Sequence, residues 1–198
     1  MTRSSTAPAA SPLAPSASEP RSTFSLSLRR YSDFQQVVDF RLPGVAVLGV
    51  DERPPLGHGW GPSPSHVLGS ALGACLGSTL LLVMQGAGAE VLDLRTDVSG
   101  AIQRDTLGQP HVTSISVRLT PVVAKRSDLD TIPSPERLAE RSTIADSLRS
   151  DLGLWIAITP EVRGETQTDP YGTPDVRGSG DPRHLMRGAR VPSASTRA

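Results

Sequence analysis

The stretch DERPPLGHGWGPSPSHVLGSALGACLGSTLLLVM, residues 51–84, decides the fold. Its first third is rich in proline and glycine, which disfavour regular structure, and it therefore predicts a loop. Ser63 followed by Pro64 is typical of a helix start, with serine as the N-cap and proline at the first helical position. The following residues predict a helix that runs to about Gln85, where Gly86 and the next glycine end it.

This helix is unusually apolar, because Val67 to Met84 contains no charged residue and is long enough to cross a membrane. No aromatic belt or basic flank brackets it, and the neighbouring amphipathic segments need a core to cover. We therefore interpret it as the central core helix of a soluble protein and expect no membrane partner. Gly69, Gly73 and Gly77 fall four residues apart and predict a smooth ridge on which another helix could sit closely.

The segments around this helix predict an α+β chain. A second helix begins at Ser134-Pro135 and places Leu138, Ser142, Ala145 and Leu148 on one inward face. A turn is expected at residues 29–33. Alternating apolar and polar residues, or short β-branched runs, predict strands at residues 24–28, 34–40, 45–50, 92–98, 114–119 and 154–158. The order is three strands, the long helix, two strands, a helix and a strand, which predicts an antiparallel sheet with two helices.

Composition excludes several classes of protein. Acidic and basic residues balance at 20 each, so we expect no general attraction to nucleic acid or to an anionic membrane. The single cysteine, Cys75, cannot form an internal disulfide, which argues against a disulfide-stapled secreted fold and agrees with a reducing cytoplasm. His58, His66 and His111 have no ligand-like spacing, so neither a metal nor a cofactor is expected.

Both ends of the chain lack apolar periodicity. Residues 1–22 are rich in Ala, Ser and Pro and have no apolar segment typical of a secretory signal, so we expect a disordered leader; an organellar transit peptide is the alternative. Residues 163–198 are punctuated by Gly and Pro and predict a disordered tail. The expected folded domain is therefore residues 23–162.

Residues 51–84 resemble the signature of the OsmC/Ohr thiol-hydroperoxidase family, in which an acidic-Pro loop and a Gly-Pro-x-Pro segment lead into a buried helix with the first reactive cysteine. The resemblance extends over nearly all of residues 23–162. It implies an intertwined homodimer with the long helices at its centre and the reactive sites at the subunit interface. It also implies a chemistry. The first cysteine reduces a peroxide and becomes a sulfenic acid, which a second cysteine captures as a disulfide that a dithiol reopens.

The resemblance identifies Cys75 as the first cysteine, but two other parts of the pattern are missing. Ser142 stands at the place of the second cysteine, and Ser65 with His66 stands where the family has a glutamate. The family's activating arginine lies in the first hairpin, which makes Arg30 the catalytic candidate beside Cys75. Arg29 and, in the loop, Arg53 are further candidates for that arginine. His66 is either a partner for substrate or proton transfer or a partly exposed side chain.

Two functions follow from this pattern. The first is a one-cysteine thiol peroxidase for organic hydroperoxides, recycled by an external thiol and active in peroxide-stress defence. The alternative is a non-catalytic homodimer that binds an apolar small molecule at its interface. The reactivity of Cys75 distinguishes them, because an activated thiolate is modified fast at neutral pH and a structural thiol is not.

Overall fold

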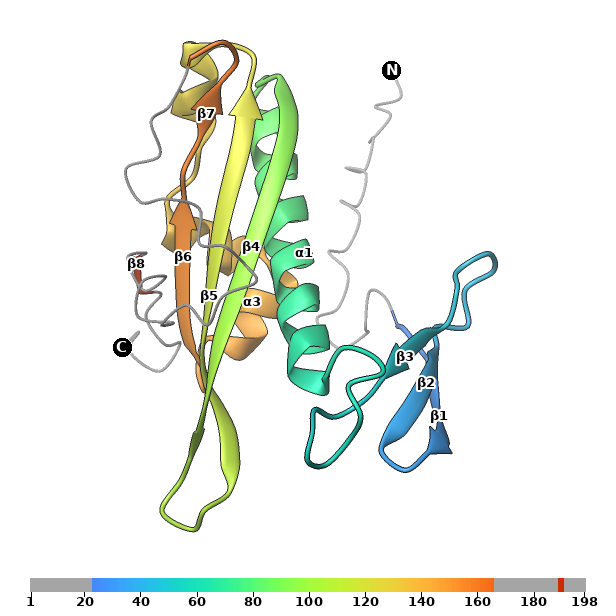
Figure 1. Cartoon of the computed structure of the whole chain (residues 1–198). Helices are drawn as coiled ribbons and strands as arrows, with labels where there is room; N and C mark the ends of the chain where they lie inside the picture. The colour runs from blue at the N-terminus through green and yellow to red at the C-terminus, as the bar shows by residue number, and fades with distance from the viewer. Residues whose placement is uncertain (1–22, 166–188, 191–198) are drawn as a thin grey trace, which may run out of the picture.

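The computed structural model describes residues 23–165 and 189–190 (Figure 1). The expected leader, residues 1–22, and most of the expected tail, residues 163–198, lie outside these ranges. Within them the chain has two sheets and a set of helices that pack against the larger sheet, so the predicted α+β class is confirmed.

The N-terminal part forms a small antiparallel sheet in the order β1-β2-β3, which confirms the predicted meander. Its strands are β1 (Ser27–Ser32), β2 (Gln35–Asp39) and β3 (Leu48–Val50). The predicted turn at residues 29–33 is wrong, because Arg29 and Arg30 lie in β1 and pair with Val37 and Gln36. The chain reverses at Asp33 instead, where φ is 39°, a left-handed conformation that aspartate tolerates better than most residues.

Helix α1 (Pro64–Gly86) begins and ends close to the predicted residues, with Ser63 as the N-cap and Gly88 just beyond at φ 88°. Leu72, Leu76 and Leu80 on one of its faces are fully buried, which fits a core helix. Within the described ranges α1 is also the one helix whose length and apolar composition would suffice to cross a membrane, a test that the core helices of soluble proteins pass as well.

The larger sheet has the order β4-β5-β6-β8, with β7 paired to β5. The strands are β4 (Val91–Arg104), β5 (Pro110–Val123), β6 (Gly153–Ile158), β7 (Glu161–Val162) and β8 (Ala189–Arg190). β4 and β5 form a long antiparallel hairpin, but β6 runs parallel to β5. The expected antiparallel sheet is therefore mixed, because helices connect β5 to β6 and return the chain to the end where β5 began.

The predicted second helix is broken in two. After the short 3₁₀ helix η1 (Arg126–Thr131), α2 (Pro135–Arg141) ends at Ser142, whose extended backbone (ψ 115°) separates it from α3 (Thr143–Leu148). The Ser142 side chain caps α3 by accepting a hydrogen bond from the Ala145 N–H at 3.5 Å. Leu138, Ser142 and Ala145 are nevertheless fully buried, as the inward face requires.

The glycine ridge of α1 packs against a strand and not, as expected, against another helix. A Cβ placed on Gly69 would lie 3.3 Å from Val98 of β4, and one on Gly77 would lie 3.3 Å from Leu94. At Gly73 it would lie only 2.7 Å from Cγ2 of Val98, a contact that real structures do not show. The ridge therefore lets β4 of the same chain approach α1 closely.

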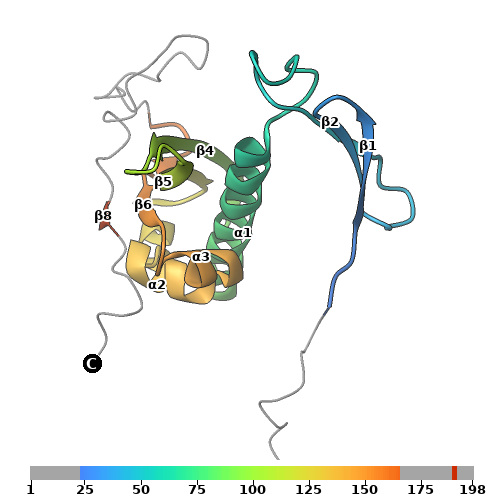
Figure 2. The same cartoon turned by 90° about the horizontal axis from the view of Figure 1, so that it is seen from below.

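The small sheet stands apart from the helical body, joined to it by the loop of residues 51–63 (Figures 1 and 2). Several large apolar side chains of this region are exposed, namely Phe24, Leu26, Leu28, Tyr31, Phe34, Leu42, Val45 and Val47. Leu82 of α1 is 70% exposed. A single chain thus leaves apolar surface open to water on both the small sheet and the central helix.

We predict that Gly73→Ala destabilises the protein by about 1–3 kcal/mol, because the added methyl group overpacks the contact with Val98. Gly86→Ala is the matched control. It lies at the end of the same helix with nothing within 4 Å of the new Cβ, so it should stabilise by about 0.5–1 kcal/mol. Urea unfolding midpoints measure both changes. If the urea midpoints of both variants shifted in the same direction, the close contact between Gly73 and Val98 of β4 would be contradicted.

Candidate functional site

Cys75 and Ser142, far apart in the sequence, meet where α1 packs on α3. The Ser142 hydroxyl donates a hydrogen bond to the Cys75 sulfur, with 3.1 Å between Oγ and Sγ. Cys75 is half-buried and Ser142 is completely buried. Because the Ser142 oxygen accepts from the Ala145 N–H, its own proton is directed toward the sulfur. The residue that stands in the second cysteine's place therefore contacts the first.

This contact has a clear chemical meaning. The Ser142 hydroxyl is a polar partner for the sulfur, the atom that reacts when a cysteine acts as a nucleophile. It cannot close a disulfide, however, so an oxidised Cys75 has no resolving partner within residues 23–165. No hydrogen bond or ion pair joins Cys75 to an arginine, lysine or histidine in the described part of the chain.

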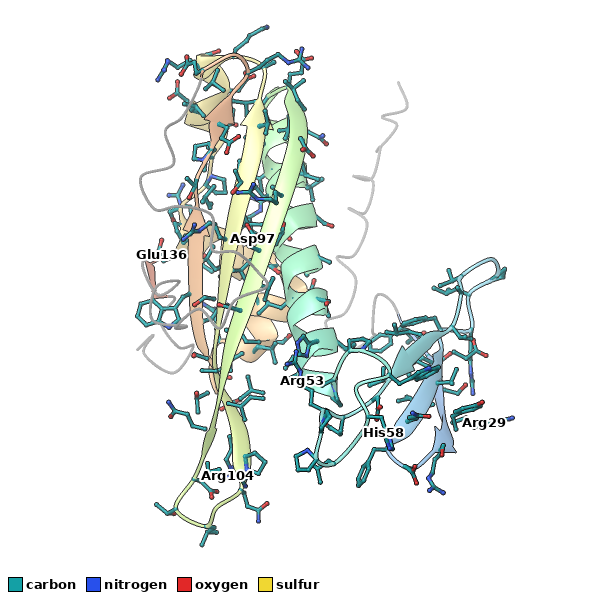
Figure 3. The ribbon with its side chains drawn as sticks, viewed as in Figure 1. Arg29, Arg53, His58, Asp97, Arg104 and Glu136 are labelled. Atoms are coloured by element: carbon teal, nitrogen blue, oxygen red, sulfur yellow. The ribbon has the colours of Figure 1, made fainter. Side chains whose placement is uncertain are left out.

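Arg30 does not lie beside Cys75 within one chain. Its side chain is exposed on β1, and its Nε donates to the Asp33 carbonyl oxygen at 2.9 Å. The neighbouring Arg29 points away from the helical body at the far side of the small sheet (Figure 3). The two catalytic candidates, Cys75 and Arg30, are therefore placed on separate parts of the protein.

Arg53 and His66 instead form a polar cluster at the start of α1, where Figure 3 shows Arg53. Arg53 Nη2 lies 3.1 Å from His66 Nε2, and His66 Nδ1 lies 2.6 Å from the Ser63 hydroxyl. Since a guanidinium only donates, His66 Nε2 accepts, and the ring proton sits on Nδ1 and points to Ser63. Ser63 in turn lies 2.9 Å from the Ser65 hydroxyl. This chain of hydrogen bonds holds Arg53 over the helix start.

A buried carboxylate fixes the loop that carries Arg53. Asp51 is fully buried, and its Oδ2 accepts hydrogen bonds from the backbone N–H groups of His58 and Trp60, both at 3.0 Å. The Trp60 N–H contributes most to lowering the pKa of Asp51, although burial works in the other direction. Trp60 also stacks on Tyr31 of β1 at a centroid distance of 5.9 Å. The same loop thus ties α1 to the small sheet.

A cavity of about 860 Å³ opens between the first turns of α1 and the β4–β5 hairpin. Its polar end contains Arg53, Ser65 and His66, and the strands supply apolar side chains. Gly69 and Gly73 form the helical wall. Because helical residues turn by about 100° each, Cys75 lies about 200° around the helix from Gly73. The cavity and the cysteine therefore lie on opposite faces of α1.

Sequence reasoning named Arg53 and His66 separately but missed both their contact and the cavity. The local signal for Ser63 and His66 is their spacing of three across a helix start, which brings both side chains to one place. Nothing in the sequence indicates that Arg53 folds back onto them. As for metals, no three His, Cys, Asp or Glu side chains gather into a possible metal-binding group among the residues that the structure describes.

A small sheet, a long core helix bearing a half-buried cysteine, and a second helical segment that contacts this cysteine together define an OsmC-like α+β fold. The family model for OsmC-like protein matches residues 57–156, just over half of the 198 residues. The chain belongs to this family. No curated protein sequence matches it significantly.

Solved structures agree on the fold. A hypothetical protein from Aquifex aeolicus VF5 superposes with a TM-score of 0.56 at 13% identity, over 71% of this chain and 98% of that one. An OsmC-like protein from Mycoplasma pneumoniae gives a TM-score of 0.56 at 17% identity, over 72% and 99%. An organic hydroperoxide resistance protein OsmC from Legionella pneumophila gives 0.52 at 11% identity, over 73% and 98%. Family membership supports a role in peroxide stress at the level of the family.

We predict that Ser142→Cys forms an intramolecular disulfide with Cys75 on mild oxidation, since the two side-chain atoms already lie 3.1 Å apart. Mass spectrometry of the intact protein would show the loss of two hydrogens and of both free thiols. Ser147→Cys on the same helix, whose hydroxyl bonds the Thr143 carbonyl oxygen and not sulfur, is the matched control and should stay reduced. Two free thiols or only intermolecular crosslinks in the Ser142 variant would show that the helices do not meet in this way.

Proposed function

We propose that this protein is a one-cysteine thiol-dependent peroxidase that reduces organic hydroperoxides, with Cys75 as the reacting residue. The observation that carries the proposal is the hydrogen bond from Ser142 to the Cys75 sulfur. It gives the sulfur a hydroxyl partner, and this partner is a residue unable to form a disulfide at the position where the OsmC/Ohr resemblance has its second cysteine. Cys75 is only half-buried, which fits a cysteine that meets a small reactant.

The reaction balances with one hydroperoxide and two external thiols. The Cys75 thiolate attacks the terminal peroxide oxygen, the O–O bond breaks, and the departing alkoxide takes a proton to become the alcohol. Cys75 is left as a sulfenic acid. A first thiol then attacks this sulfur, which releases water and forms a mixed disulfide. A second thiol breaks the mixed disulfide, so the two reductant molecules leave as a disulfide and Cys75 returns to its thiol form.

The proposal includes a homodimer in which Arg30 of one copy serves Cys75 of the other. Support comes from the small sheet, which carries Arg30 away from its own α1, and from exposed apolar side chains next to its strands, such as Phe24, 92% exposed, and Phe34. The exposed Leu82 of α1 offers a complementary apolar surface. Burial of these groups between two copies would remove apolar area from water and would stabilise the dimer by roughly 25 cal/mol per Å² of apolar area buried. A cation brought beside Cys75 would further favour its thiolate.

The second candidate function, a non-catalytic protein that binds an apolar small molecule, is favoured by a different observation. The cavity of about 860 Å³ has an apolar wall and does not include Cys75 among its lining residues. A binding protein of this kind would keep its ligand after Cys75→Ser and would consume no peroxide.

The catalytic proposal predicts that the purified protein consumes cumene hydroperoxide in the presence of a monothiol and that Cys75→Ser abolishes this activity. The rate should be modest and should decay during turnover, because a sulfenic acid without an internal partner is open to a second peroxide. Peroxide consumption measures the rate, and mass spectrometry detects the sulfinic acid at Cys75. Equal consumption by wild type and Cys75→Ser would overturn the proposal.

The dimer proposal predicts twice the monomer mass in sedimentation experiments at micromolar concentration. Phe34→Asp should shift the equilibrium toward monomer, since it places a charge in the exposed apolar surface of the small sheet. Leu107→Asp, on an apolar side chain exposed at the tip of the β4–β5 hairpin, is the matched control and should leave the mass unchanged. A wild-type monomer would contradict the proposed assembly.

A further inference from the structure

The cavity on the glycine face of α1 has the dimensions and wall of a ligand site. Its volume of about 860 Å³ falls within the range of small-molecule sites, roughly 300–1,000 Å³. Gly69 and Gly73 line it from the helix side. Because Cys75 lies on the opposite face of the helix, this site is distinct from the one at which the proposed peroxide chemistry takes place.

The strand wall of the cavity is apolar and incompletely covered. Ile115 of β5 lines the cavity but is only 2% exposed, whereas Val112 is half-buried and Val98 and Ile102 of β4 are 38% and 56% exposed. An apolar ligand body laid along these side chains would remove their surface from water, and the hydrophobic effect would stabilise the complex.

The helix end of the cavity presents hydrogen-bond donors. Arg53 uses one guanidinium nitrogen on His66, which fixes the side chain and leaves other N–H groups to face a ligand. Ser63 lies 2.6 Å from His66 Nδ1 and 2.9 Å from the Ser65 hydroxyl. Ser65 lines the cavity and brings its hydroxyl group, a possible donor, to the same end as Arg53. A guanidinium with a nearby hydroxyl donor suits a carboxylate.

The local charge favours an anion over a cation. The 23-residue helix α1 begins here with no acidic residue in its first turn, so the partial positive charge of its N-terminus is not compensated by the helix itself. Arg53 adds a full positive charge at the same end. Glu52 also lines the cavity, and its negative charge would repel an anion. Replacing Glu52 with a neutral residue therefore tests which charge the cavity prefers.

We propose that this cavity binds a monocarboxylate with an apolar body, the carboxylate held by Arg53 and Ser65 and the body packed on Val98, Ile102, Val112 and Ile115. The site acts independently of the chemistry at Cys75. Its ligand is therefore selected by charge at one end and by apolar surface at the other.

Isothermal titration of the full chain with octanoate, octanol and octylammonium, all below their aggregation limits, tests the proposal. Octanoate should bind with saturation at one site per chain and more tightly than either of the other two. Arg53→Gln should weaken octanoate binding about tenfold, as expected for losing a hydrogen bond to a charged group, and leave octanol binding within about twofold. Arg29→Gln, also exposed but not among the residues that line the cavity, should change the affinity for neither ligand, and Glu52→Gln should strengthen octanoate binding.

A second pair of variants tests the apolar wall and the location. Ile102→Ser should weaken the binding of both octanoate and octanol. Leu107→Ser, exposed on the same hairpin but outside the cavity, should weaken the binding of neither. Cys75→Ser should keep its octanoate affinity, so loss of peroxidase activity and loss of binding can be told apart. Absence of saturable octanoate binding, tighter binding of octylammonium, or equal losses in Arg53→Gln and Arg29→Gln would overturn the proposal.

Discussion

The contact between the glycine face of α1 and strand β4 governs the rest of the structure. Gly69, Gly73 and Gly77 let the helix backbone approach β4 so closely that a side chain added at Gly73 would collide with Val98, and one added at Gly69 or Gly77 would be crowded. A helix held this closely cannot turn about its axis without a clash. Its opposite face is therefore fixed as well, and that face carries Cys75 to Ser142. One packing contact thus sets both the thiol site and the cavity on the other side.

Local sequence signals were sufficient to predict the parts of the fold that are determined by residues adjacent in the chain. Ser63-Pro64 and the closing glycines located α1 almost to the residue, because helix caps are formed by adjacent residues. The inward face predicted for the second helix correctly placed Ser142 in the core, where its side chain contacts Cys75. These two successes account for the central part of the candidate site.

The features that could not be predicted depend on contacts between distant residues. Glycines four apart fit a helix partner as well as a strand partner, and only the folded chain shows β4 on this ridge. The direction of β6 is set by the helices that connect it to β5, and strand periodicity carries no information about it. Ser142 breaks the second helix because its side chain caps α3, a choice that competes with the continuous helical pattern. The reach of Arg53 to His66 depends on how the loop folds around Asp51.

The most direct test of the catalytic claim is the rate at which iodoacetamide alkylates Cys75 at pH 7. The native protein should react faster than the same protein unfolded in urea, and Ser142→Ala should lose much of this advantage, because the proposal makes Cys75 an activated nucleophile and Ser142 donates its hydrogen bond to the reacting sulfur. If native Cys75 reacts more slowly than in the unfolded chain, and Ser142→Ala does not change the rate, then Cys75 is a structural thiol and the catalytic function is excluded.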